Sequence, residues 1–105
     1  MMQVTQETRE NWLVVTVRGR VDSVTADELE EKLRTAVEQD DKVALDFHAV
    51  DYVSSAGLRA VIQAARAAEG KSRQFVVCSL SAPVKKVFDM SGMHHFLRIQ
   101  GELPC

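Results

Sequence analysis

The stretch Asp51-Tyr52-Val53-Ser54-Ser55-Ala56-Gly57-Leu58-Arg59 lies where an extended apolar segment gives way to an alanine-rich helical pattern. Apolar residues then recur with the 3.6-residue period of an amphipathic helix, at Leu58, Val61, Ile62 and Ala65. Ser54 or Ser55 is therefore predicted at the N-terminal boundary of this helix, where free backbone N–H groups and the helix dipole favour a phosphoryl group or another anion. Serine is also a preferred N-cap residue, so local physics alone predicts a capping role.

Five other segments have the pattern of β-strands. The first two are joined by a short polar turn and predict a hairpin, the third alternates as a half-buried strand, and the fourth is continuously apolar, as expected of a strand covered on both faces. The fifth is short. The predicted strands are residues 4–8, 12–18, 43–48, 75–78 and 96–99.

Two further helices are predicted from their start signals. Thr25-Ala26-Asp27-Glu28 is a capping-box sequence, and the helix that it opens ends near residues 39–41. The central helix runs to about Glu69 and ends at Gly70. Ser81 caps the last helix, with Pro83 in its first turn, and Gly92 ends it.

The order β-β-α-β-α-β-α-β predicts a single α/β domain, with a mixed sheet whose central strands are mainly parallel and are packed by helices. Helices join the second, third and fourth strands, so the loops after these strands should meet at one edge of the sheet. Asp22, residues 50–57 and residues 80–82 are therefore expected to share one rim.

Length and composition bound the organisation and the partners. The 105 residues, 46% of them hydrophobic, predict one domain over 1–105, with a structured core over about 3–100 and a frayed tail from Gly101 to Cys105. A net charge of -2 gives no basic footprint for nucleic acid.

The sequence has no apolar run of about 20 residues and no signal peptide at its N-terminus, so we expect a cytoplasmic protein without membrane insertion. Cys78 and Cys105 form no CxxC pair and are expected to be free thiols, Cys78 as a small core residue.

Three blocks of the sequence together resemble one family. Asp51 to Arg59 resembles the phosphoacceptor loop of the STAS domain, the small fold of bacterial anti-sigma-factor antagonists. Gly19-Arg20-Val21-Asp22-Ser23-Val24-Thr25-Ala26 resembles the family's loop after the second strand, and residues 76–93 resemble its fourth strand and third helix. The resemblance spans nearly the whole chain and implies that Ser55 is phosphorylated by a partner kinase.

The resemblance also implies the partners. The kinase would be an anti-sigma factor, a serine kinase with a histidine-kinase-like ATPase fold that sequesters a sigma factor or another effector. The unphosphorylated chain would bind it as a free monomer and release the effector, phosphorylation of Ser55 would end binding, and a metal-dependent serine phosphatase would restore the active form. The chain itself would need no cofactor, metal or catalytic residue, because ATP and magnesium belong to the kinase.

Seven residues beside Ser55 are candidates for partner binding by this resemblance: Asp22, Ser23, Thr25, Ser54, Ala56, Gly57 and Arg59. Asp22 could instead only cap a turn, and Arg59, with Arg66 on the same helical face, could be solvated. Ser54 stands where many members have aspartate, and Ala56 where some have a second serine. Arg20 replaces an acidic residue of the best-known sporulation members, which argues for a different cognate partner.

Two other functions and a metal site are alternatives to the switch. A hydrolase triad could be assembled on paper from Ser55, a histidine and Asp22 or Asp51, but the chain has no G-x-S-x-G elbow. The pair His94-His95 lacks the further ligands of a metal site. The stronger rival is a STAS module that acts as a constitutive adaptor in a transport or stress-sensing assembly, without phosphorylation.

Overall fold

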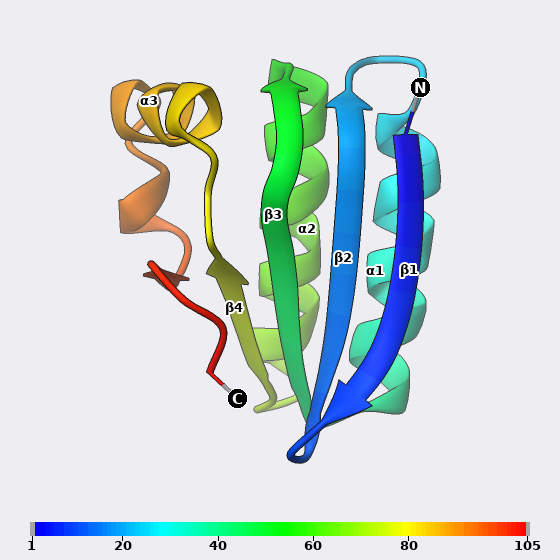
Figure 1. Cartoon of the computed structure of the whole chain (residues 1–105). Helices are drawn as coiled ribbons and strands as arrows, with labels where there is room; N and C mark the ends of the chain where they lie inside the picture. The colour runs from blue at the N-terminus through cyan, green and yellow to red at the C-terminus, as the bar shows by residue number, and fades with distance from the viewer. Residues whose placement is uncertain (1, 105) are drawn as a thin grey trace.

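The computed structural model describes residues 2–104, and within them the predicted order of elements is confirmed (Figure 1). A 3-10 helix, η1, precedes the last strand and is absent from the prediction. The elements are β1 (Met2–Arg9), β2 (Trp12–Val21), α1 (Ala26–Gln39), β3 (Lys42–Val53), α2 (Ser55–Gly70), β4 (Gln74–Cys78), α3 (Ala82–Met90), η1 (Met93–His95) and β5 (Ile99–Gln100).

The five strands form one mixed sheet in the order β1-β2-β3-β4-β5. β1 and β2 pair antiparallel, whereas the pairs β2–β3, β3–β4 and β4–β5 are parallel. The hairpin turns at Glu10 and Asn11, whose φ angles of 49° and 74° match the left-handed turn that suits the twist of a two-residue hairpin. The prediction of a mixed sheet with parallel central strands is therefore confirmed.

Helices α1 and α2 lie side by side on one face of the sheet, and α3 follows the loop after β4 and packs against β3 (Figure 1). Each of the two long helices turns an apolar stripe toward the sheet, as its 3.6-residue period predicts. The main core fills the space between the helices and the sheet. Its largest fully buried side chains include Phe47, Phe88, Leu29, Leu33 and Leu45.

The opposite face of the sheet carries a second, smaller apolar cluster, formed by Trp12, Val14, Ala44, Val76 and Cys78. Leu103 packs against this cluster, although it lies in the segment for which the sequence predicts fraying. Cys78 is buried, as expected, while Cys105 lies outside the described residues.

The central strand β3 is longer and more buried than predicted. The alternating pattern predicts exposure on one face, but the second cluster covers Ala44, and Asp46 is only 6% exposed. The Asp46 carboxylate accepts a hydrogen bond from the backbone N–H of His48 over 3.0 Å and lies 2.9 Å from the Nδ1 atom of that residue. The buried carboxylate is therefore hydrogen-bonded, as burial of a polar group requires.

The predicted last strand over residues 96–99 is wrong in its boundaries. Gly92 adopts the left-handed conformation (φ 66°) that closes α3, and the chain then makes η1 before β5 begins at Ile99. The backbone N–H groups of Phe96 and Leu97 bond to the Met93 carbonyl oxygen, so these residues cannot pair as a strand. Phe96 is consequently 60% exposed.

The glycine predicted to end α2 is itself helical. Gly70 is the last residue of α2, and the residue with a left-handed backbone is Ser72, with φ 56°. Ser81 does precede α3, but its hydroxyl makes no capping bond there. None of the described helices is long and apolar enough to cross a membrane.

Candidate functional site

The loops after β2, β3 and β4 meet at one rim of the sheet, as the topology predicts. The backbone N–H of Ser54 donates a hydrogen bond to the Val21 carbonyl oxygen over 2.8 Å, which joins the end of β2 to the start of α2. The Ser81 hydroxyl donates to the Val50 carbonyl oxygen over 2.6 Å and joins the loop after β4 to β3. These two bonds hold the loops after β2, β3 and β4 together at one edge of the sheet.

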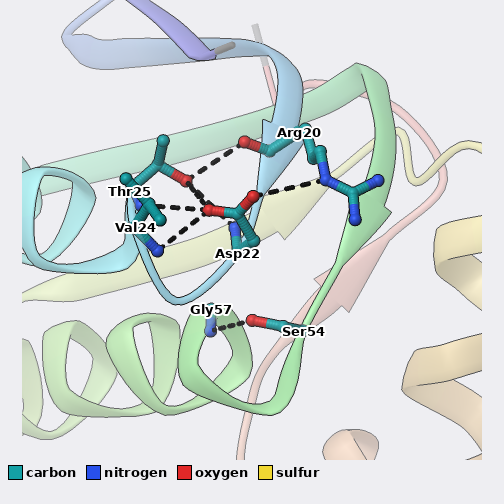
Figure 2. A network of polar contacts seen from close by, with 6 residues as sticks. All are labelled: Arg20, Asp22, Val24, Thr25, Ser54 and Gly57. Carbon is teal, nitrogen blue, oxygen red and sulfur yellow. Dashed lines mark hydrogen bonds and ion pairs between the residues drawn. The ribbon is translucent and has the colours of Figure 1, made fainter.

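The two serines have different roles in the fold. Ser54 is the N-cap of α2, and its Oγ atom accepts a hydrogen bond from the backbone N–H of Gly57 over 3.3 Å (Figure 2). Ser55 is the first residue of the helix and is exposed, and no described residue hydrogen bonds to its hydroxyl. The capping role that local physics predicts therefore falls on Ser54 and leaves the Ser55 hydroxyl accessible.

Gly57 brings the first turn of α2 close to the sheet. A Cβ atom at this position would lie 2.7 Å from Val21 Cγ1 and 2.8 Å from Val53 Cγ2, closer than side chains pack. Both valines are buried and β-branched, so neither can turn away easily. Gly57 thus determines how closely the start of α2, which carries Ser55, approaches the ends of β2 and β3. Ala56, between Ser55 and Gly57 in the sequence, is partly buried.

The loop between β2 and α1 is organised by Asp22, and the predicted capping box is wrong. Thr25 precedes α1 but makes no side-chain capping bond. Asp22 Oδ1 instead accepts hydrogen bonds from the backbone N–H groups of Val24 (3.0 Å) and Thr25 (3.2 Å) (Figure 2). The Thr25 hydroxyl is turned back toward β2, where it donates to the Arg20 carbonyl oxygen over 3.1 Å and accepts from the Asp22 N–H over 3.0 Å.

These contacts set the charge of Asp22. Partial burial of the carboxylate acts to raise its pKa, but the hydrogen bonds from the Thr25 and Val24 backbone, the Thr25 hydroxyl and the Arg20 guanidinium outweigh it. The pKa of Asp22 is therefore below the ordinary aspartate value. Asp22 thus caps the turn, and its role as a partner contact stays a prediction.

Arg20 and Tyr52 form a second feature of the rim. They are register partners on β2 and β3, and the Arg20 guanidinium carbon lies 3.9 Å from the centre of the Tyr52 ring. Arg20 Nε also lies 3.2 Å from Asp22 Oδ2. The sequence singled out Arg20 by its charge but missed Tyr52, because their contact depends on the register between two strands.

Val24 is a second candidate contact residue that the sequence analysis does not identify. Its side chain is 85% exposed at the tip of the loop between Asp22 and Thr25. The signal was present in the sequence, since a large apolar residue in a polar turn has no core to enter. Of the other predicted partner contacts, Ser23 is exposed in this loop, and Arg59 is exposed on α2, four residues after Ser55 and hence on the same helical face.

The histidines do not assemble a catalytic arrangement with Ser55. Among residues 2–104, no histidine hydrogen bonds to the Ser55 hydroxyl, and His48 instead contacts Asp46. In the same range, no group of three or more His, Cys, Asp or Glu side chains gathers in a way that could hold a metal ion.

The fold and the rim together define a small α/β domain that presents an exposed serine at the start of a central helix, beside an ordered loop. The chain belongs to the STAS domain family, whose sequence profile matches residues 3–103.

Named relatives agree with this assignment. The chain is 35% identical over 92 residues to a candidate anti-sigma factor antagonist, BtrV, of Bordetella bronchiseptica, an alignment that covers 87% of this chain and 79% of the relative. An anti-sigma factor antagonist from Mycobacterium paratuberculosis has the same fold, with a TM-score of 0.84 at 24% identity over 98% of this chain and 88% of that one. The phosphorylated form of the Bacillus cell fate determinant SpoIIAA superimposes with a TM-score of 0.70 at 20% identity, covering 95% and 93% of the two chains.

Proposed function

We propose that the chain is a partner-switching regulator controlled by phosphorylation of Ser55. The unphosphorylated form binds a cognate anti-sigma factor, which is also a serine kinase, and so releases the sigma factor or another effector held by that kinase. The observation that carries this proposal is the division of roles between two adjacent serines, because Ser54 caps α2 while the Ser55 hydroxyl is exposed and bonds to none of residues 2–104.

A phosphate on Ser55 is compatible with the fold. It would add about -1.5 to -2 charges at the N-terminus of α2, where the helix dipole and the free N–H groups offset negative charge. A partner surface that packs on the rim must instead remove water from the phosphate, which is unfavourable unless the surface supplies a cation. Phosphorylation therefore ends binding without unfolding the regulator.

The names of the relatives support the choice of partner. BtrV is named as a candidate antagonist of an anti-sigma factor, and SpoIIAA has been solved in a phosphorylated form. By this proposal the kinase has a histidine-kinase-like ATPase fold and supplies ATP and magnesium, a metal-dependent phosphatase removes the phosphate, and the exchange takes place in the cytoplasm. The regulator contributes a substrate serine and a docking surface and no catalysis of its own.

The proposal is tested first by mapping phosphorylation sites by mass spectrometry on the protein isolated from its native cells, with a phosphatase-treated sample as the control. One phosphate on Ser55 is the expected result. Phosphate on Ser54 would keep the switch and move its site, whereas no phosphate under several growth conditions would favour the constitutive adaptor.

A pull-down from the same cells then tests the partner. Unmodified protein and Ser55→Ala should capture a serine kinase in the presence of magnesium and ADP, and Ser55→Asp should capture less. Ser72→Asp is the matched control, since it places the same charge on an exposed serine beyond the C-terminal end of α2, away from the rim. Equal capture by the wild type and Ser55→Asp would contradict control by local charge.

A further inference from the structure

Three exposed side chains on the rim that carries Ser55 have no role in the core. Val24 is 85% exposed and Tyr52 is 41% exposed, and the Arg20 side chain is 53% exposed. A single exposed apolar residue is ordinary on a protein surface. Here Arg20 contacts the Tyr52 ring, and Val24 lies in the loop that follows the end of β2. Tyr and Arg are among the residue types that most often dominate binding energy at interfaces.

The loop that carries Val24 is fixed before any partner arrives. Its backbone N–H bonds to Asp22 Oδ1 over 3.0 Å, and the Thr25 hydroxyl ties the same loop to the Arg20 carbonyl oxygen. Binding through Val24 therefore orders little additional backbone, which lowers the entropic cost of association. A rigid apolar tip of this kind fits a pocket in the partner.

The Arg20 guanidinium is also held in place, but only part of its bonding capacity is used. Its plane is positioned by the Tyr52 ring and by the bond from Nε to Asp22 Oδ2. Within residues 2–104, no hydrogen bond involves its two terminal nitrogens, which project away from Asp22 (Figure 2). This end of the guanidinium matches the two oxygens of a carboxylate.

The position of Arg20 relative to the serines links recognition to regulation. Arg20 and Val21 pair with Tyr52 and Val53 across the two strands, and Ser54 follows directly with its N–H bonded to Val21. A partner surface that covers this end of β2 and β3 and contacts Arg20 would thus also extend over the start of α2, where Ser55 is exposed. A phosphate there would repel a partner carboxylate at Arg20 in addition to its own cost of desolvation.

We propose that Arg20, Val24 and Tyr52 determine partner specificity, by binding a protein surface that offers a carboxylate to Arg20 and an apolar pocket to Val24. The inference rests on the proposed function and adds the chemistry of its partner. By this inference, repulsion between that carboxylate and a phosphate on Ser55 causes part of the loss of binding on phosphorylation.

The test measures the dissociation constant of the full chain with the kinase captured in the pull-down described above. Arg20→Glu should weaken binding at least about 30-fold and the neutral Arg20→Gln about tenfold, because truncating one side of a charge pair leaves the other unpaired. Arg9→Glu is the matched control: it makes the same charge change on a similarly exposed arginine, 48% against 53%, and should alter binding less than about twofold.

Val24→Asp should weaken binding at least about tenfold, and Phe96→Asp, which alters an exposed apolar residue outside the rim, should not.

A charge reversal then identifies the carboxylate. One Asp→Lys or Glu→Lys change in the kinase should restore binding of Arg20→Glu to within about tenfold of the wild-type pair and should reduce the loss caused by Ser55→Asp. Urea unfolding of each variant shows that it is folded. Wild-type affinity for both Arg20 variants and for Val24→Asp would overturn this inference and leave the proposed function standing, whereas a pull-down that captures no kinase would overturn both.

Discussion

A methyl group added to the α-carbon of Gly57 would lie 2.7 Å from the Cγ1 atom of Val21. The contact joins the first turn of α2, which carries the serines, to the end of β2, which carries Arg20 and Asp22. The position of the helix on the rim thus depends on the absence of a side chain at one residue.

Gly57→Ala is therefore expected to destabilise the domain. The added methyl group would also meet Val53 Cγ2 at 2.8 Å and the Val21 carbonyl oxygen at 3.2 Å, so α2 or the strands must shift. Overpacking of this kind costs about 1–3 kcal/mol of unfolding free energy, measurable by urea denaturation. Gly70→Ala is the matched control in the same helix, because nothing lies within 4 Å of its added methyl group. Equal stability of the two variants would contradict the close approach.

The two serines should respond differently to the same substitution. Ser54→Ala removes the oxygen that accepts the Gly57 N–H, and loss of an N-cap costs about 1 kcal/mol of unfolding free energy. Ser55→Ala removes an exposed hydroxyl with no bonding partner among the described residues, and its effect should stay within about 0.5 kcal/mol. Urea denaturation of both variants side by side checks this, and a larger loss for Ser55→Ala would reverse the assigned roles.

Sequence patterns predicted the order of the elements and the convergence of three loops, because hydrophobic period and parallel topology are properties of the chain's own pattern. The capping box fails because Asp22 takes the Thr25 N–H, which the Glu28 side chain would accept in a capping box. The Thr25 hydroxyl is then turned back to β2, where it bonds to the Arg20 carbonyl oxygen and the Asp22 N–H, and it is not available to the Glu28 N–H.

The stack of Arg20 on Tyr52 could not be predicted for a different reason. The pairing of β2 with β3 shifts register twice, between Thr16 and Arg18 and again between Gly19 and Arg20. A shift of one residue moves a side chain to the other face of the sheet, and the pattern of the strands does not show where such irregularities fall.

The bonds at Asp22 should make the β2–α1 loop sensitive to acid. Because the folded-state pKa of Asp22 is lowered, the ionised carboxylate stabilises the loop above the ordinary value of 3.8, and this contribution is lost as the pH falls from 3.8 through the lower folded pKa. An NMR titration that follows the Asp22 carboxyl carbon and the Val24 amide should show both signals moving together below pH 3.8. Asp22→Asn should abolish the transition at the Val24 amide, and a folded-state midpoint above 3.8 would contradict the bonding.

Leu103 gives a test of the second cluster. It packs against the group that contains Trp12, the single tryptophan of the chain. Leu103→Ala should shift the tryptophan emission to longer wavelength and cost about 1 kcal/mol of unfolding free energy, since the removed side chain is only partly buried. Glu102→Ala, a change at its exposed neighbour, should leave the emission unchanged. An unchanged spectrum for Leu103→Ala would mean that the C-terminal segment does not shield the indole.

Arg73 joins two elements that are far apart in the chain. Its Nη1 atom donates to the carbonyl oxygens of Val37 and of Glu38, the latter over 2.7 Å. Arg73, which directly precedes β4, thereby caps the C-terminus of α1. Arg73→Ala leaves these carbonyls without their charged donor and should lower the unfolding free energy by about 1–3 kcal/mol in urea denaturation. Arg73→Lys should recover part of the loss, because a single ammonium retains the charge but not the fork of donors. Arg98→Ala serves as the control, since that exposed side chain makes a single 3.4 Å contact with Gln74, and a loss as large as that of Arg73→Ala would show that the effect comes from charge and not from the helix terminus.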